Sequence, residues 1–238
     1  MRKILITNDD GIDSDGIKRL AEAARDYGEV WVIAPLHQRS AASHSITLRE
    51  PIDVYPHDFP VKGVRAYACS GTPADCVRVG GLSVMPYRPD VVLSGINDGY
   101  NMATDLQYSA TVGAAFEGAF QGWLAIALSE SFGGSGEVTD AYIKEVLGEC
   151  LEMKVDHRRV INVNFPGCSI DDFRGIRRNC KTSKSSIFKD HYNVIGELEG
   201  GGKRYMVEGV HNEECEEGTD FKVLMENHIS IGIISNVG

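Results

Sequence analysis

Short apolar runs alternate with amphipathic helical patterns along most of the chain, and this alternation constrains the fold more than any other feature. Residues 4–7 are predicted to form a buried strand, apolar side chains recur with helical spacing over 17–24, and 30–34 are predicted as the next strand. A strand, a helix and a strand in this order form a parallel pair with a right-handed crossover. The sequence therefore predicts an α/β fold with a mostly parallel sheet.

The same order continues to about residue 165. Thr72 and Pro73 suit the cap and the first position of a helix, and Asp75 stands where a capping box has its acid. We expect this helix to turn Cys76, Val77, Gly80 and Leu82 inward. The other predicted elements are strands at 90–95, 124–128 and 160–163 and helices at 112–119 and 142–151.

Two segments break the alternation and look rich in β-structure, residues 46–69 and everything after about 165. We therefore divide the chain into a core, 1–165, with a β-rich excursion at 46–69, and a variable C-terminal part, 166–238. An extended C-terminal arm that packs on a neighbouring subunit and a local hairpin both agree with this pattern.

Composition excludes several classes of partner. The net charge of −10 and the pI near 5.2 argue against a nucleic-acid polymer or an anionic membrane surface. Six cysteines are scattered without a C-x-x-C pair, and no apolar run approaches the roughly 18 residues that a membrane span needs. A reducing cytoplasm is the expected location.

The first predicted strand ends in Asn8-Asp9-Asp10-Gly11. Two adjacent carboxylates can reach one cation only where the chain turns, because side chains on a continuing strand point to opposite faces. Asn8 and Gly11 tolerate such a turn. An ordinary strand-to-helix loop and an ion site are both compatible with these four residues.

Other predicted strand ends offer ligands for the same ion. Ser40 follows the second strand and Asn97 follows the third, so that carboxylate, hydroxyl and amide oxygens would surround the ion. Such a set favours one hard divalent ion, Mg²⁺ or Mn²⁺, over zinc. Taken singly, Ser40 is also compatible with a surface loop and Asn97 with a turn.

A second group of polar residues precedes the helix at 112–119. Ser109 and Thr111 place two hydroxyls beside the free N–H groups of a helix start, which suits a phosphate, and Asn101 adds an amide donor nearby. A plain helix cap is the alternative, although capping needs only one hydroxyl.

Taken together, the motifs resemble the SurE family of metal-dependent nucleotidases, which act on nucleoside monophosphates. The resemblance spans most of the chain in order and spacing. Its motifs are T-N-D-D-G-I at 7–12, R-S-A-x-S-H-S-I-T at 39–47, S-G-T-P-A-D-C-V at 70–77, S-G-I-N-x-G-x-N at 94–101, Y-S-x-T-V-G-A-A at 108–115, N-V-N-F-P at 162–166 and G-T-D at 218–220.

The resemblance implies that Asp9, Asp10, Ser40 and Asn97 ligate the metal. It also implies a Rossmann-like three-layer core, a C-terminal part that takes part in subunit exchange, and homodimers or homotetramers in the cytoplasm. The implied activity is that of a 5′-nucleotidase, with 3′-nucleotidase and exopolyphosphatase activities as further alternatives.

Hydrolysis of a phosphomonoester by a metal-activated water is the mechanism that these residues favour. Asp9 or Asp10 would take the proton of the water, whereas Ser109, Thr111 and Asn101 would hold the phosphate. His44 is a candidate acid for the leaving group, although a loop histidine is also compatible with a structural role. The alternatives are a Mg²⁺-binding receiver domain of signalling proteins and a nucleotide binder without activity.

Overall fold

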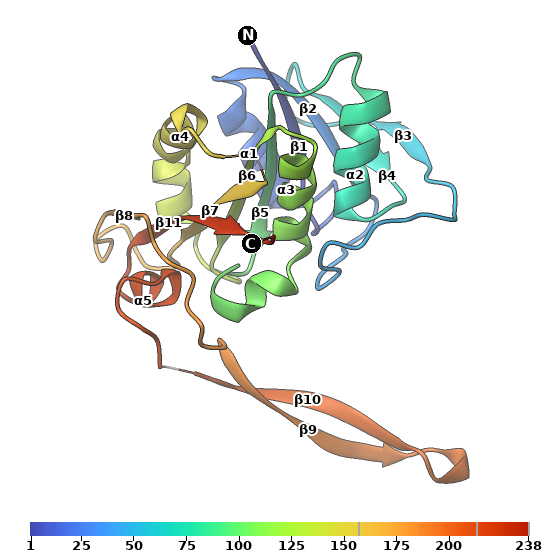
Figure 1. Cartoon of the computed structure of the whole chain (residues 1–238), viewed down its shortest axis with the longest axis vertical. Coiled ribbons are helices and arrows are strands. Elements are labelled where there is room, and N and C mark those ends of the chain that lie inside the picture. The colour runs from blue at the N-terminus through green and yellow to red at the C-terminus, as the bar shows by residue number, and fades with distance from the viewer. Residues whose placement is uncertain (157, 213, 238) are drawn as a thin grey trace.

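The computed structural model describes residues 1–156, 158–212 and 214–237, and its centre is one nine-stranded sheet (Figure 1). Six neighbouring strands are parallel, and β3 and β11 run antiparallel to their neighbours β4 and β7. In sheet order the strands are β3 (Val54–His57), β4 (Arg65–Cys69), β2 (Gly28–Pro35), β1 (Arg2–Thr7), β5 (Val91–Asp98), β6 (Leu124–Glu130), β7 (Arg159–Phe165), β11 (Ile229–Ser235) and β8 (Ile176–Arg178). The predicted α/β fold with a mostly parallel sheet is confirmed.

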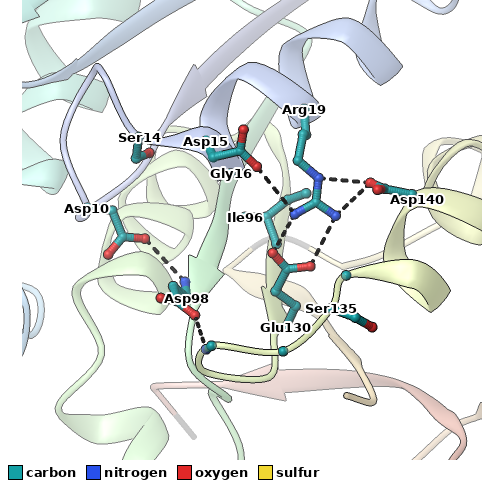
Figure 2. Close-up of a pocket in the computed structure, with 13 residues that line it drawn as sticks. Asp10, Ser14, Asp15, Gly16, Arg19, Ile96, Asp98, Glu130, Ser135 and Asp140 are labelled. Carbon is teal, nitrogen blue, oxygen red and sulfur yellow. Dashed lines mark hydrogen bonds and ion pairs between the residues drawn. The ribbon is translucent and has the colours of Figure 1, made fainter. Parts of the chain in front are cut away.

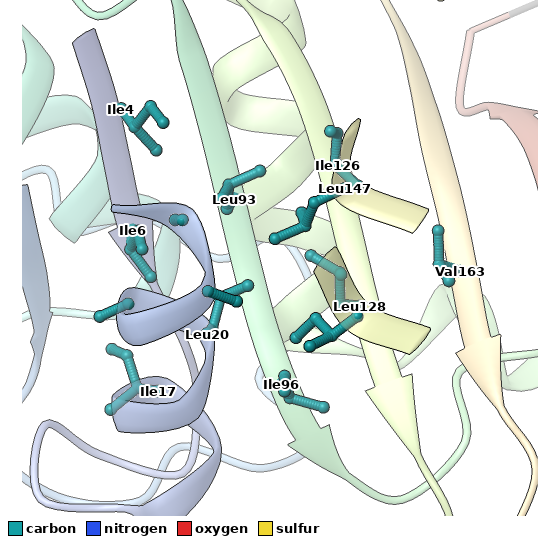
Figure 3. Close-up of a cluster of buried hydrophobic side chains, with 14 of the residues drawn as sticks. Ile4, Ile6, Ile17, Leu20, Leu93, Ile96, Ile126, Leu128, Leu147 and Val163 are labelled. Atoms are coloured by element: carbon teal, nitrogen blue, oxygen red, sulfur yellow. The ribbon is translucent and has the colours of Figure 1, made fainter. Parts of the chain in front are cut away.

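Helices cover both faces of the sheet and make a three-layer core. Ile4 and Ile6 point to one face and pack with Ile17 and Leu20 of α1 (Figure 3). Leu5 packs on the other face, as strand alternation requires. The first face carries α1 (Asp15–Ala24) and α4 (Glu137–Glu152), and the second carries α2 (Pro73–Val79) and α3 (Ala110–Phe120).

The predicted helix start at Thr72 is confirmed. The Thr72 hydroxyl accepts the N–H of Asp75, and the Asp75 carboxylate accepts the N–H of Thr72, which completes a capping box. Cys76, Val77 and Gly80 are buried as expected. The prediction for Leu82 was wrong: a π-helical turn, η1 (Gly80–Val84), follows α2 and shifts the helical register, which leaves Leu82 38% exposed.

The segment 46–69 contains β-structure at one edge of the main sheet. It supplies β3 and β4, and β4 pairs in parallel with β2 at the edge of the main sheet. Strands β8 and β11 of the C-terminal part extend the opposite edge of the main sheet. The helix α5 (Asp220–Met225) directly precedes β11 in the chain.

Among the described residues, one hairpin projects from this body. The antiparallel hairpin of β9 (Phe188–Glu197) and β10 (Lys203–His211) reaches far beyond the core (Figure 1). Two short 3₁₀ turns complete the structure, η2 (Ala103–Gln107) before α3 and η3 (Glu199–Gly201) at the hairpin tip. Within the described residues, none of the helices combines the length and apolar character needed to cross a membrane.

Candidate metal and phosphate site

The candidate residues gather at the carboxyl ends of β1, β2 and β5. In the sheet, β2 and β4 lie on one side of β1, whereas β5, β6 and β7 lie on the other. Loops that leave β1 and β5 therefore diverge to opposite faces and open a crevice between them, which is where doubly wound α/β folds bind ligands. The carboxyl end of the sheet thus sets the position of the site, and the loops that follow the strands supply its polar side chains.

Asp9 lies at the bottom of this crevice and is 4% exposed. Its Oδ1 accepts a hydrogen bond of 2.5 Å from the Thr111 hydroxyl. Burial, together with the negative charge of Asp10, raises the pKa of Asp9 to about 6, although the hydrogen bond from Thr111 opposes the rise. A cation beside this carboxylate would offset the cost of burying its charge.

Asp10 is half-buried and linked to two other parts of the site. Its Oδ2 accepts the backbone N–H of Asp98 at 3.2 Å, and its Oδ1 lies 3.4 Å from Nε2 of Gln38. The same Gln38 amide donates to Oγ of Ser40 at 3.0 Å, so it joins two of the candidate ligands. Burial and the charge of Asp98 raise the pKa of Asp10. Gln38 was not among the predicted site residues, because an exposed loop glutamine has no distinctive pattern.

A pocket of about 200 Å³ brings candidate ligands from separate elements together. Its lining includes no lysine or arginine, so no side-chain cation neutralises the carboxylates that line it. Among the described residues no three histidine, cysteine, aspartate or glutamate side chains form a metal-holding group. The pocket lining adds the hydroxyl of Ser40 and the side-chain amide of Asn97 to the carboxylate of Asp9. Such a donor set fits a hard divalent ion. The candidate residues that line the pocket are Asp9, Ser40, Asn97, Asn101 and Ser109.

Asn101 is held from several directions at the wall of this pocket. Its N–H donates to Oδ1 of Asn164 at 2.8 Å, and its carbonyl accepts from Nδ2 of both Asn162 and Asn164 at 2.9 Å. Its side-chain amide donates to Ser129 at 2.8 Å. The three supporting residues were missed as site residues, although the polar pair in the otherwise apolar strand β7 was a usable signal.

The start of α3 borders the pocket. Oγ of Ser109 accepts the N–H of Val112 at 3.1 Å, so Ser109 is the helix cap, and it also lines the pocket. Thr111 is fully buried, and the structure aims its hydroxyl at Asp9. The structure therefore brings Ser109, but not the Thr111 hydroxyl, to the pocket wall.

His44 lies away from the other candidates. Its Nε2 is 3.0 Å from Glu117 on α3, and it does not line the pocket. Glu117 also accepts from Arg78 at 3.1 Å and from Gln121 at 2.8 Å. Burial opposes the ionisation of Glu117, but the hydrogen bonds from His44 and Gln121 and the charge of Arg78 hold its pKa below the ordinary value.

A larger pocket of about 580 Å³ adjoins the first and shares Asp98 with it (Figure 2). Asp10 lines this pocket on the side of the crevice. Its far wall holds Arg19, whose guanidinium pairs with Glu130 and Asp140 at 2.6 Å each. The two pockets are therefore neighbours, the smaller at the start of α3 and the larger beside α1.

Comparison with known proteins shows which family the chain resembles. Residues 4–188 match the family model described as Survival protein SurE. The 5′-nucleotidase SurE of Clostridium botulinum (strain Loch Maree) is 40% identical over 233 residues, which cover 96% of this chain and 90% of that protein. The 5′-nucleotidase SurE of Pelobacter propionicus is 37% identical over 234 residues, 96% of this chain and 91% of that one.

A solved structure supports the same assignment. The crystal structure of the SurE protein from Aquifex aeolicus superimposes with a TM-score of 0.82 at 30% identity, covering 98% of this chain and 92% of that one. These matches are to SurE proteins and not to the receiver domains that were the alternative interpretation of the sequence. This chain belongs to the SurE family.

Proposed function

We propose that this protein is a divalent-metal-dependent 5′-nucleotidase that hydrolyses nucleoside monophosphates to nucleoside and phosphate. The observation that carries the proposal is the pocket where Asp9, Ser40 and Asn97 meet the start of α3. The curated relatives named above are 5′-nucleotidases, which supports the same activity here.

Asp9, Asp10, Ser40 and Asn97 would hold one divalent ion, Mg²⁺ or Mn²⁺. Nδ2 of Asn97 donates to the carbonyl of Gly99 at 2.7 Å, which leaves the amide oxygen as the atom available to a cation. When bound, the ion would polarise a phosphoryl oxygen and lower the pKa of a water molecule. One carboxylate of the Asp9 and Asp10 pair would accept the proton that this water loses.

Ser109 and Asn101 would bind the phosphate at the start of α3. The oxygen of the Ser109 hydroxyl already accepts from Val112, so its proton is available to a phosphate oxygen. For Thr111 we propose a different role from direct phosphate contact, because its hydroxyl donates to Asp9 and thereby holds that carboxylate in place. A catalytic role for His44 stays a prediction, and it requires the ring to leave Glu117.

The larger pocket would receive the nucleoside. It has about 580 Å³ of space beside the phosphate position, and its exposed carboxylates, such as Asp15 and Asp98, accept hydrogen bonds from hydroxyl or amino groups. A negative lining disfavours a second phosphate there, so a nucleoside suits this pocket better than a polyphosphate chain.

The proposal is tested by phosphate release from the purified chain with Mg²⁺ or Mn²⁺, with 5′- and 3′-nucleoside monophosphates and polyphosphate as substrates. We expect turnover that chelators abolish and that is fastest with 5′ esters. Asp9→Asn should reduce it by several orders of magnitude, whereas Asp13→Asn, an exposed change outside the pocket, should not. Nucleotide binding without turnover would instead indicate a binding protein.

We also propose that the hairpin of β9 and β10 packs against another copy of this chain to form a homodimer or homotetramer. A lone two-stranded hairpin is marginally stable, and large exposed apolar areas commonly mark interfaces. No disulfide forms among the described cysteines, which fits the reducing cytoplasm that we propose as its location. The exposed apolar side chains of the hairpin are Phe188, Tyr192, Val194, Ile195, Tyr205, Met206, Val207 and Val210.

A further inference from the structure

Residues 101–103, which we call the pocket segment, begin with Asn101 in the wall of the smaller pocket, and the structure holds them at both ends. At one end, the backbone of Asn101 is bound by two asparagines of β7. At the other end, the N–H of Ala103 donates to Oδ2 of Asp220 at 3.1 Å. Asp220 lies 117 residues further along the chain, so this second attachment depends entirely on the tertiary fold.

Ala103 needs such an attachment because its backbone is strained. Its φ is +53°, a left-handed conformation that costs an alanine about 1–2 kcal/mol. Ala103 is also only 1% exposed, so its N–H cannot form a hydrogen bond with solvent water. A strained, buried backbone conformation of this kind persists only where the surrounding contacts hold it in place.

The buried carboxylate of Asp220 accepts three backbone N–H groups, which hold it in one orientation. Asp220 is 4% exposed at the start of α5, and its Oδ1 accepts the N–H groups of Ser183 at 2.9 Å and Phe221 at 2.8 Å, while Oδ2 receives Ala103. The N–H of Asp220 itself donates to the carbonyl of Lys181 at 2.8 Å. The one carboxylate thus joins α5, the chain that leads into the hairpin, and the pocket segment.

Apolar packing closes this junction. Met102 and Ala103 form a buried cluster with Phe221 and Leu224 of α5 and with Ile187, the residue before β9. The pocket segment is therefore pressed against α5 by side chains and fixed in register by one carboxylate.

We propose that Asp220 is a positioning residue for the reaction: by accepting the N–H of Ala103 it sets the path of residues 101–103 and places Asn101 against the substrate phosphate. This inference rests on the proposed nucleotidase function. Asp220 itself touches neither the pocket nor the four proposed metal ligands, so it should act on phosphate binding and turnover rather than on the ion.

Asp220→Asn breaks one of the three contacts selectively. The amide keeps two hydrogen bonds if its oxygen stays on Ser183 and Phe221, and its NH₂ group then faces the N–H of Ala103, donor against donor. We expect kcat/KM to fall about tenfold or more, because small misplacements of a positioning group are costly to turnover. The dissociation constant of Mn²⁺ should change less than about twofold. Glu217→Gln, an exposed change in the same region, is the matched control and should leave both values unchanged.

A double-mutant cycle with Asn101→Ala separates positioning from general destabilisation. If Asp220 acts through Asn101, Asp220→Asn should have little further effect on kcat/KM in a chain that already carries Asn101→Ala. Full additivity of the two changes, or loss of thermal stability at unchanged kcat/KM, would overturn the proposal.

Hydrogen exchange tests the attachment of Ala103 to Asp220 without a measurement of activity. The amide of Ala103 should be strongly protected, and Asp220→Asn, where it folds, should release that protection while leaving peptides of β1 and β2 as slow as before. Rapid exchange at Ala103 in the unmodified chain would contradict the positioning role. An unmodified chain that protects Ala103 but releases no phosphate would instead contradict only the nucleotidase function.

Discussion

Gly113, in the first half of α3, lies against the loop that carries Ser40. A Cβ at position 113 would come within 2.5 Å of the carbonyl oxygen of Ser43 and 2.9 Å of Cα of His44. Both atoms belong to the backbone, so no side-chain rotation can relieve the clash. Gly113→Ala therefore forces the loop away from α3.

The loss in free energy of unfolding can be worked out from the contacts of Ser43. Its oxygen must retreat by at least about 0.5 Å to reach the 3.0 Å that real Cβ atoms tolerate. Ser43 is held by two hydrogen bonds, from its N–H to Tyr108 at 3.0 Å and from its hydroxyl to Gln107 at 2.7 Å. Overpacking costs about 1–3 kcal/mol and each weakened hydrogen bond about 1 kcal/mol, against a gain of about 1 kcal/mol in helix propensity. We expect a net loss of about 2–4 kcal/mol.

Urea unfolding and Mn²⁺ titration of the same variant measure both consequences. The displaced loop carries Ser40, so the Mn²⁺ dissociation constant should rise about tenfold or more. Gly118→Ala is the control on the same helix: the nearest atoms to its Cβ would belong to the Val92 side chain, at 2.8 Å, so stability should fall while Mn²⁺ binding stays normal. A Gly113→Ala protein more stable than the parent, with unchanged Mn²⁺ affinity, would refute this reasoning.

Three further predictions concern separate parts of the molecule. Thr111→Val removes the hydroxyl that supports Asp9, and calorimetry should show Mn²⁺ binding weakened about tenfold, since hydrogen bonds to charged groups contribute about 1.5–3 kcal/mol. Hydrogen bonds from Lys3, Tyr87 and Trp31 lower the pKa of Glu29 from 4.5 to about 2, so its contribution to stability is complete above pH 4.5 and is lost as the pH falls towards 2. Urea unfolding of Glu29→Gln should therefore show a weaker loss of stability over that range, and a parallel pH profile would count against it. Replacing 188–211 by a short glycine-rich linker should lower the molar mass measured by light scattering to that of a monomer, and an unchanged oligomer would exclude the hairpin as the interface.

The predicted strands and helices of the core agree with the structure because their signals are local. Apolar alternation and capping residues act within a few positions of one another, as at Thr72 and Asp75. The place of β4 was not predictable in this way. Its pairing with β2 joins residues more than thirty positions apart across a connection that contains no helix.

The candidate site was predicted in part, for a related reason. Asp9 stands out because acids follow an apolar strand, and the structure does place it with Ser40 and Asn97 around one pocket. Supporting residues such as Gln38 and Ser129 carry no such pattern, since their importance depends on which side chain they face.

The sequence by itself determined the order of strands and helices and the polar, turn-forming residues at the strand ends, because these depend on periodicity and backbone preference over short distances. Only the tertiary structure decided which distant groups meet. It directs the Thr111 hydroxyl to Asp9, His44 to Glu117 and the N–H of Ala103 to Asp220. A buried polar group must find a partner wherever the packed chain brings one within hydrogen-bonding distance, and sequence separation does not restrict that choice.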